Sequence, residues 1–341
     1  MAQSSPQRIK IENEDQVYAL IEKLKQNAIN TDGLSVDFDG WPRLTMHLHG
    51  ESFDSTITPP LMKAFLELQN GLYRSYAIAK YNSPKITNLT KEEKDALEIK
   101  VKVQPGSSIF SVDMQQLLEK LCHDLVGKMD PSSVIMTVLG AGLIWAGHSA
   151  WKSYLDHRTQ IRQSEIKNEE QRSLIEHLKF AQEKETERAK ILADIVVQTP
   201  RLQTISNYAE DAKNQLLKRS ISADKIEIYD TELNSDVAEE LVKNARTKSS
   251  DIRLDGMYRI LSVDSSNPEE FKVRLRSVDS MDEFSAKVQD RTLDRKYLEA
   301  LQYGEWSRKP VKLQINAKLL NEEIKHALVI KAEITQVISD I

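Results

Sequence analysis

Three residues with metal-binding side chains alternate along one short stretch of this chain: His47, His49 and Glu51. Alternate residues of a β-strand project from the same face of a sheet, so a strand would place the two imidazoles and the carboxylate side by side. Two histidines and a carboxylate form a ligand set for zinc or iron. The polar residues Arg43 and Thr45 continue this face, which is also the pattern of a half-buried strand with a solvated side. A metal-dependent hydrolase is therefore the third of three hypotheses.

Basic residues alternate in the same way near the C-terminal end of the sequence. Lys272, Arg274 and Arg276 are interleaved with apolar residues, which predicts a strand with a basic stripe on one face. Such a stripe, with aromatic residues nearby, is a feature of grooves that bind single-stranded nucleic acid. Acidic and basic residues are nearly balanced over residues 251–341, however, and a charged strand face also protects a sheet edge.

Catalytic motifs are missing from the sequence. No GxSxG, HExxH or GxxxxGK[ST] pattern occurs. Cys122 and His123 are adjacent, but adjacent helical residues point about 100° apart and cannot form a nucleophile–base pair. Because Cys122 is the only cysteine, an intrachain disulfide is also excluded. We therefore expect a protein that is not an enzyme and that uses no cofactor.

The elements of the chain are organised around one apolar segment, residues 132–155. Its uncharged part, residues 134–147, supplies about two-thirds of the roughly 20 apolar residues that a membrane-spanning helix needs. Small residues allow close helix packing in lipid and in tight soluble bundles, and tryptophans suit a membrane interface. The residues expected to act in oligomerisation or membrane contact are Gly140, Gly142, Ala146, Gly147, Ala150, Trp145 and Trp151. Self-association is predicted in either environment.

The charges that flank this segment bear on topology. Basic residues are more frequent after the segment than before it, which predicts a cytoplasmic C-terminal part. The first 130 residues would then have to cross the membrane, although the polar N-terminal stretch has no signal-peptide pattern. The alternative is that the apolar helix packs within a protein core.

The remaining patterns predict an α+β protein. Alternating runs around turn residues predict hairpins at residues 34–49 and 97–114, and a long gap without glycine or proline predicts that the apolar helix continues as a charged rod. Coiled-coil contact is expected near Leu174, Ile175 and Leu178. The expected parts are an α+β globular domain with an antiparallel sheet over 1–130, the apolar helix over 131–155, a charged helical rod or hairpin over 156–220, and a β-rich domain, a small sheet or open barrel, over 221–341.

Two further hypotheses follow from this layout. The first is a self-associating, membrane-linked scaffold or effector, such as one in a bacterial stress or antiviral response, with cytoplasmic domains that bind an unidentified protein partner. The second is a cytoplasmic homo-oligomer with a central helical bundle, whose C-terminal strands contact nucleic acid. The net charge of −5 provides no global attraction to nucleic acid or anionic lipid.

Overall fold

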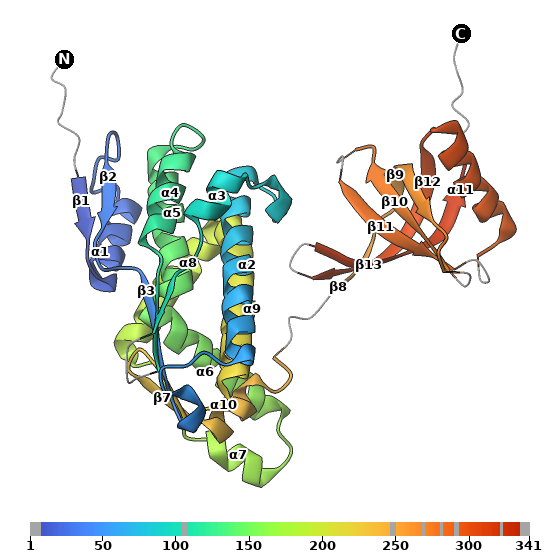
Figure 1. Ribbon diagram of the computed structural model, residues 1–341. Coiled ribbons are helices and arrows are strands. Elements are labelled where there is room, and N and C mark those ends of the chain that lie inside the picture. Colours follow the sequence, from blue (N-terminus) through green and yellow to red (C-terminus); the bar gives the residue numbers. More distant parts are fainter. Residues whose placement is uncertain are drawn as a thin grey trace, which may run out of the picture. The chain divides into compact units, whose positions relative to one another are not determined.

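The structure is a computed structural model that describes residues 8–103, 108–245, 250–267, 270–279, 282–289, 293–320 and 323–334. The α+β class is confirmed, and the chain divides into two compact units, Met1–Arg246 and Thr247–Ile341 (Figure 1). The domain boundary expected at residue 221 lies instead at 246. The strand that was predicted to open the C-terminal domain pairs with a strand near residue 45, and so completes the sheet of the first unit.

The first unit contains the following elements: β1 (Arg8–Ile11), α1 (Glu14–Lys25), β2 (Ser35–Phe38), β3 (Arg43–His49), η1 (Glu51–Phe53), α2 (Pro59–Tyr81), η2 (Ile86–Asn88), α3 (Lys91–Ala96), β4 (Val101–Val103), β5 (Ile109–Asp113), α4 (Gln115–Leu125), α5 (Pro131–Ala146), α6 (His148–Glu165), α7 (Glu169–Ile175), α8 (Glu183–Gln198), α9 (Pro200–Ser220), β6 (Lys225–Ile228), β7 (Thr231–Asn234) and α10 (Ser235–Val242).

The main sheet of this unit has the strand order β4-β5-β3-β6-β7, and every neighbouring pair is antiparallel. The hairpin predicted at residues 97–114 is confirmed as β4 and β5. The hairpin predicted at residues 34–49 is wrong, because β2 pairs in parallel with β1 and makes no ladder with β3. Trp41, in the link between β2 and β3, is buried against Gly142 of α5, so the link is held by the helical core and not by a hairpin turn.

The apolar segment forms α5 at the centre of the first unit. Asp130 caps its N-terminus through the Ser133 N–H, and every residue from Val134 to Ala146 except Met136 is buried. Helices α1, α4, α6, α8 and α9 pack against it, and α2 and α9 run side by side (Figure 1). At Gly147 the chain bends by 57° into α6, so the apolar helix does not continue straight.

The charged rod expected over residues 156–197 is also corrected, because the segment forms the separate helices α6, α7 and α8. The side chain of Asn168 caps α7, and Gln182 forms a capping box at the start of α8. The Asp156 carboxylate accepts two backbone N–H groups from the link between α7 and α8, at 2.8 and 2.9 Å. These polar side chains satisfy the backbone groups that each break exposes, and α8 folds back onto α6. The helix predicted after Pro200 is confirmed as α9.

The second unit contains β8 (Ser250–Arg253), β9 (Gly256–Asp264), β10 (Phe271–Ser277), β11 (Glu283–Val288), α11 (Arg295–Ser307), β12 (Val311–Leu320) and β13 (Glu323–Glu333). Strands β9, β10, β11, β13 and β12 form a closed barrel, because β12 pairs with both β13 and β9. Strand β8 extends the barrel from β12, and α11 packs against β9, β12 and β13. The β-rich domain, predicted as a small sheet or an open barrel, is thus a closed barrel.

Candidate functional sites

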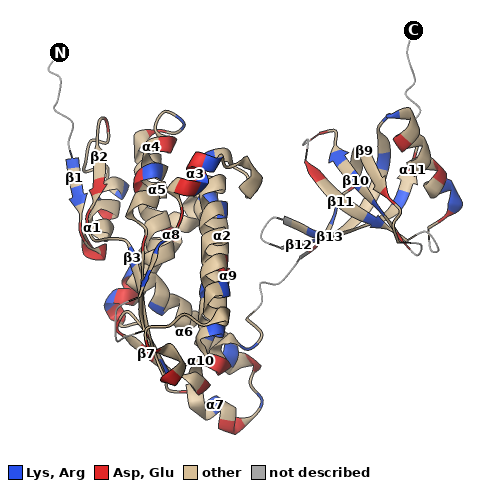
Figure 2. Cartoon of the chain, in the orientation of Figure 1, with Lys and Arg blue, Asp and Glu red and all other residues tan. Residues whose placement is uncertain are grey.

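The basic stripe lies on β10 in the second unit; Figure 2 colours lysine and arginine residues blue. Val273 and Leu275 have no exposed surface and fill the barrel interior. The intervening residues Lys272, Arg274 and Arg276 therefore project from the outside of the barrel, as the alternation predicted. Strand alternation was sufficient to place them because one face of the strand is fully buried.

A carboxylate from β11 lies among these cations. Glu283 contacts Arg276 at 2.5 Å and Arg274 at 3.0 Å. The guanidinium of Arg276 in particular holds the pKa of Glu283 below its usual value. Glu283 therefore stays ionised at neutral pH and orients both arginine side chains across the sheet.

Lys287 of β11 extends the cationic row to the next strand. It is directly opposite Lys272 in the β10–β11 ladder, and its Nζ lies 2.7 Å from a Glu270 carboxylate oxygen. Within the described residues, β11 and β13 pair at a single position, Lys287 opposite Leu328. A cleft of about 660 Å³ lies at this position. Its charged and polar lining residues are Asp251, Arg253, Lys287, Gln289, Asn316, Lys318 and His326.

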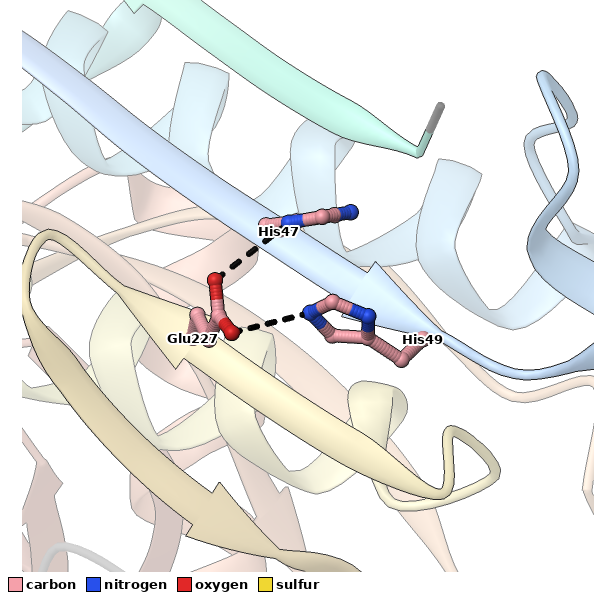
Figure 3. A group of neighbouring side chains, drawn as sticks. All are labelled: His47, His49 and Glu227. Atoms are coloured by element: carbon pink, nitrogen blue, oxygen red, sulfur yellow. Dashed lines mark ion pairs between the residues drawn. The ribbon is translucent and has the colours of Figure 1, made fainter. Parts of the chain in front are cut away.

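A second group, on the sheet of the first unit, brings together His47, His49 and Glu227 (Figure 3). His47 Nδ1 lies 3.3 Å from Glu227 Oε2, and His49 Nε2 lies 3.0 Å from Glu227 Oε1. The three side chains are 28%, 35% and 25% exposed, respectively. The predicted third member, Glu51, lies outside the group: the strand ends at His49, Gly50 follows with a φ of +140°, and Glu51 begins η1. Strand alternation therefore stops before Glu51 is reached.

Lys225 is the cationic neighbour of this group. Its Nζ lies 2.6 Å from Glu227 Oε1 and 3.1 Å from Glu232 Oε1. This ammonium is the main reason that the pKa of Glu227 is held below its usual value. The Nε2 atom of His49 is shielded from water and, among the described residues, has no hydrogen-bond partner, although Glu227 is close to it.

The small residues of α5 accommodate neighbours within the same chain. The Gly140 position is filled by Leu202 of α9, and the Gly142 position by Trp41 and Leu118. A Cβ atom at either position would lie too close to these neighbours, which explains why both positions are glycine. The remaining members of the predicted set, Ala146, Ala150, Trp145 and Trp151, are buried, and Gly147 forms the junction between α5 and α6.

The membrane prediction applies to this same segment. Among the described residues, no single helix has both the length and the apolar character to cross a bilayer; α5 and α6 meet these requirements only as a pair bent by 57°. Membrane linkage and self-association thus stay predictions. The residues expected in a coiled coil include Ile175, which is fully buried, and Leu174, which is 47% exposed.

Comparisons with protein-family models, with curated proteins and with solved structures gave no significant match. What the chain binds must therefore follow from the chemistry of its own surfaces. Two groups have side chains that suit a ligand. The cationic face of β10 and β11, in the second unit, suits an anion, and the His47–His49–Glu227 group, in the first unit, suits a metal ion.

Proposed function

We propose that the second unit binds single-stranded nucleic acid through its sugar–phosphate backbone, along the outer face of β10 and β11. The main support is the row of four cations on two adjacent strands: Lys272, Arg274, Arg276 and Lys287. Successive outward side chains of a strand are about 6.8 Å apart, so the three cations of β10 form a straight track of roughly 14 Å. Lysine and arginine tracks of this kind follow a phosphate backbone.

The connectivity of the barrel supports this location. The closed order β9-β10-β11-β13-β12, with a helix between β11 and β12, has the connectivity of oligonucleotide- and oligosaccharide-binding barrels. In those barrels the second and third strands form the ligand-binding face, and here these strands are β10 and β11. The likeness concerns the fold, and the choice of ligand rests on the cations.

The aromatic residues of these strands favour recognition of phosphates over bases. Phe271 and Phe284 are partly buried against the barrel core, and Phe284 contacts the ring of Tyr258 edge-on. Among the described residues of β10 and β11, no aromatic side chain shares the outer face with the cations. Base stacking is the usual source of salt-resistant affinity for single strands. We therefore expect binding with little sequence preference and a strong dependence on salt.

The carboxylates within the row limit its strength. Glu283 and Glu270 pair with three of the four cations, and Asp264 of β9 is directly opposite the fourth, Lys272, so four positive charges share the face with three negative ones. Arginine has five N–H donors, and pairing with Glu283 leaves others for phosphate oxygens. Binding is expected at low ionic strength and is expected to weaken as salt screens the face.

The test is fluorescence anisotropy of a labelled 20-nucleotide oligothymidylate titrated with the full chain at low salt. The double variant Lys272→Glu with Arg274→Glu should lose binding. The matched control is Arg295→Glu with Lys296→Glu, which reverses two charges on α11, where both side chains are exposed. This control changes the net charge by the same amount but lies on α11, which packs against β9, β12 and β13, so it should lose much less affinity than the β10 variant.

Conservative variants give the salt dependence. Replacing Lys272 and Arg274 by glutamine should reduce the slope of log affinity against log salt by about 1.4, since each phosphate contact on a single strand contributes about 0.7. The proposal is rejected if the unmodified chain does not bind the oligonucleotide at low salt. It is also rejected if the α11 control loses as much affinity as the β10 variant.

A further inference from the structure

We infer that His47, His49 and Glu227 form a binding site for a zinc-class divalent ion on the sheet of the first unit. This inference is independent of nucleic-acid binding, because it concerns a different unit of the chain. One ligand atom from each of the three residues lies within 4.8 Å of the others. Two imidazole nitrogens and one carboxylate oxygen are a ligand set that zinc accepts.

The strand pairing fixes the backbone positions of all three ligands. His47 is directly opposite Glu227 in the antiparallel ladder of β3 and β6, and His49 is two residues further along β3 on the same face (Figure 3). Zinc–ligand bonds of about 2.0–2.1 Å in a tetrahedron place neighbouring ligand atoms roughly 3.3 Å apart. The distances from His47 Nδ1 and His49 Nε2 to the Glu227 oxygens are 3.3 and 3.0 Å. These distances end on different Glu227 oxygens, so coordination requires side-chain rotations that bring three ligand atoms, now within 4.8 Å of one another, to about 3.3 Å.

The environment of His49 is consistent with a bound ion. Its Nε2 atom is shielded from water, and its contact with the Glu227 carboxylate, at 3.0 Å, does not have the geometry of a hydrogen bond. The ring centroids of His47 and His49 are 3.8 Å apart, with an angle of 41° between the ring planes, so the two imidazoles are immediate neighbours. An ion bound by His49 and Glu227 would give the shielded ring nitrogen an aligned partner.

A bound ion must displace the Lys225 ammonium from Glu227, and Glu232 is the second carboxylate that can keep this ammonium paired. The Lys225 ammonium contacts Glu227 and Glu232 at once, at 2.6 and 3.1 Å. When an ion takes Glu227, Lys225 keeps its contact with Glu232. No charge is then left without a partner.

The exposure of the group determines the kind of site. Structural zinc sites are closed by four protein ligands, whereas sites with three protein ligands keep a position for water or another small ligand. Here the three side chains are a quarter to a third exposed, so the fourth position faces solvent. The ion would also join strands that are far apart in sequence, β3 and β6.

The experiment uses the full chain, stripped of metal with a chelator and titrated with Zn²⁺ alone in competition with a chromophoric chelator. We expect one ion per chain. His47→Ala, His49→Ala and Glu227→Gln should each weaken binding by about 100-fold or more, since even the outer partners of metal ligands contribute 10- to 100-fold.

Two control variants separate this site from other sources of zinc binding. Glu51→Gln removes the carboxylate that is close in sequence but outside the group, and His123→Ala removes a histidine whose side chain is 88% exposed. Both should bind zinc as the unmodified chain does. The inference is overturned if the unmodified chain binds less than stoichiometric zinc, or if either control loses zinc to the same extent as the site variants. Unfolding temperatures of the stripped variants, compared with the stripped parent, identify any variant that fails to fold.

Discussion

Replacing Gly142 by alanine is expected to destabilise the first unit by about 1–2 kcal/mol. A Cβ atom at this position would lie 2.7 Å from Leu118 Cδ1 and 2.7 Å from an edge carbon of the Trp41 ring. Both neighbours are buried, and the indole is rigid, so the added methyl forces a shift that typically costs about 1–3 kcal/mol. The helix itself gains about 0.5–1 kcal/mol from the change, since alanine loses less backbone entropy than glycine.

Gly140→Ala is the matched control on the same helix. Its Cβ would lie 2.5 Å from Leu202 Cδ1 and 3.3 Å from Leu202 Cδ2, the ends of one flexible side chain. Rotation of that side chain relieves the contact, and the gain in helix propensity offsets part of the cost, so the loss should be smaller than at Gly142. The difference between the two variants therefore measures the rigidity of the Trp41 contact.

Urea unfolding followed by tryptophan fluorescence measures both variants. Trp41, Trp145 and Trp151 are buried in the first unit, whereas Trp306 of the second unit is 81% exposed, so the fluorescence change reports mainly on the first unit. Sedimentation velocity on the same samples gives the subunit number. If Gly142→Ala is as stable as the parent, or if Gly140→Ala is the worse of the two, the packing explanation is refuted. A changed subunit number at unchanged stability would mean that this part of α5 contacts a second copy of the chain.

Three further changes test charged groups. Arg162→Met leaves the buried Glu240 carboxylate with only its Lys243 ion pair and should cost the first unit roughly 3 kcal/mol in urea unfolding, with Glu240→Gln losing less. Burial lowers the pKa of Lys213 from its ordinary value of 10.5 to about 8. Between these two pH values the unfolded chain binds more protons than the folded one, so the free energy of unfolding should rise with pH by up to about 1.4 kcal/mol per pH unit. Lys213→Met should lack this rise when unfolding is measured at pH 8, 9 and 10. Lys225→Met should tighten zinc binding by up to about fivefold in the competition titration, since a partly exposed ion pair contributes up to about 1 kcal/mol, and unchanged or weaker binding would contradict the competition.

Local patterns of the sequence predicted local structure well. The alternation at residues 43–49 and 271–276 identified strands with the correct face outward, because a strand with one buried side repeats every second residue. Two helix starts likewise carry local signals: Thr90 forms a capping box at the start of α3, and Pro59 and Pro60 begin α2. Each of these signals is complete within a few residues of sequence.

Pairing between distant segments could not be read in the same way. Glu227 joins His47 only because β6 returns to the edge of β3 after the eight helices α2 to α9, and no local feature records that return. Gly50 was a local signal for the end of the strand. It follows β3 directly and turns the backbone, so Glu51 does not share the face of His47 and His49. Similarly, the helix propensity of the charged residues in the expected rod predicted helical structure correctly but not the breaks between helices. The breaks depend on the side-chain bonds of Asp156 and on the caps of the next helices.

The apolar helix α5 illustrates why composition alone left two environments open. A buried core helix and a lipid-facing helix both lack charge and both use small residues for close approach. In this fold α5 is 16 residues long, about 24 Å, shorter than the roughly 30 Å of a bilayer core. The Glu14 carboxylate of α1 accepts the His148 and Ser149 N–H groups at 2.7 and 3.1 Å, where α6 begins. Transfer of α5 into lipid would break these bonds and expose the faces of α4 and α9 that it covers, so any membrane linkage through α5 requires the first unit to open.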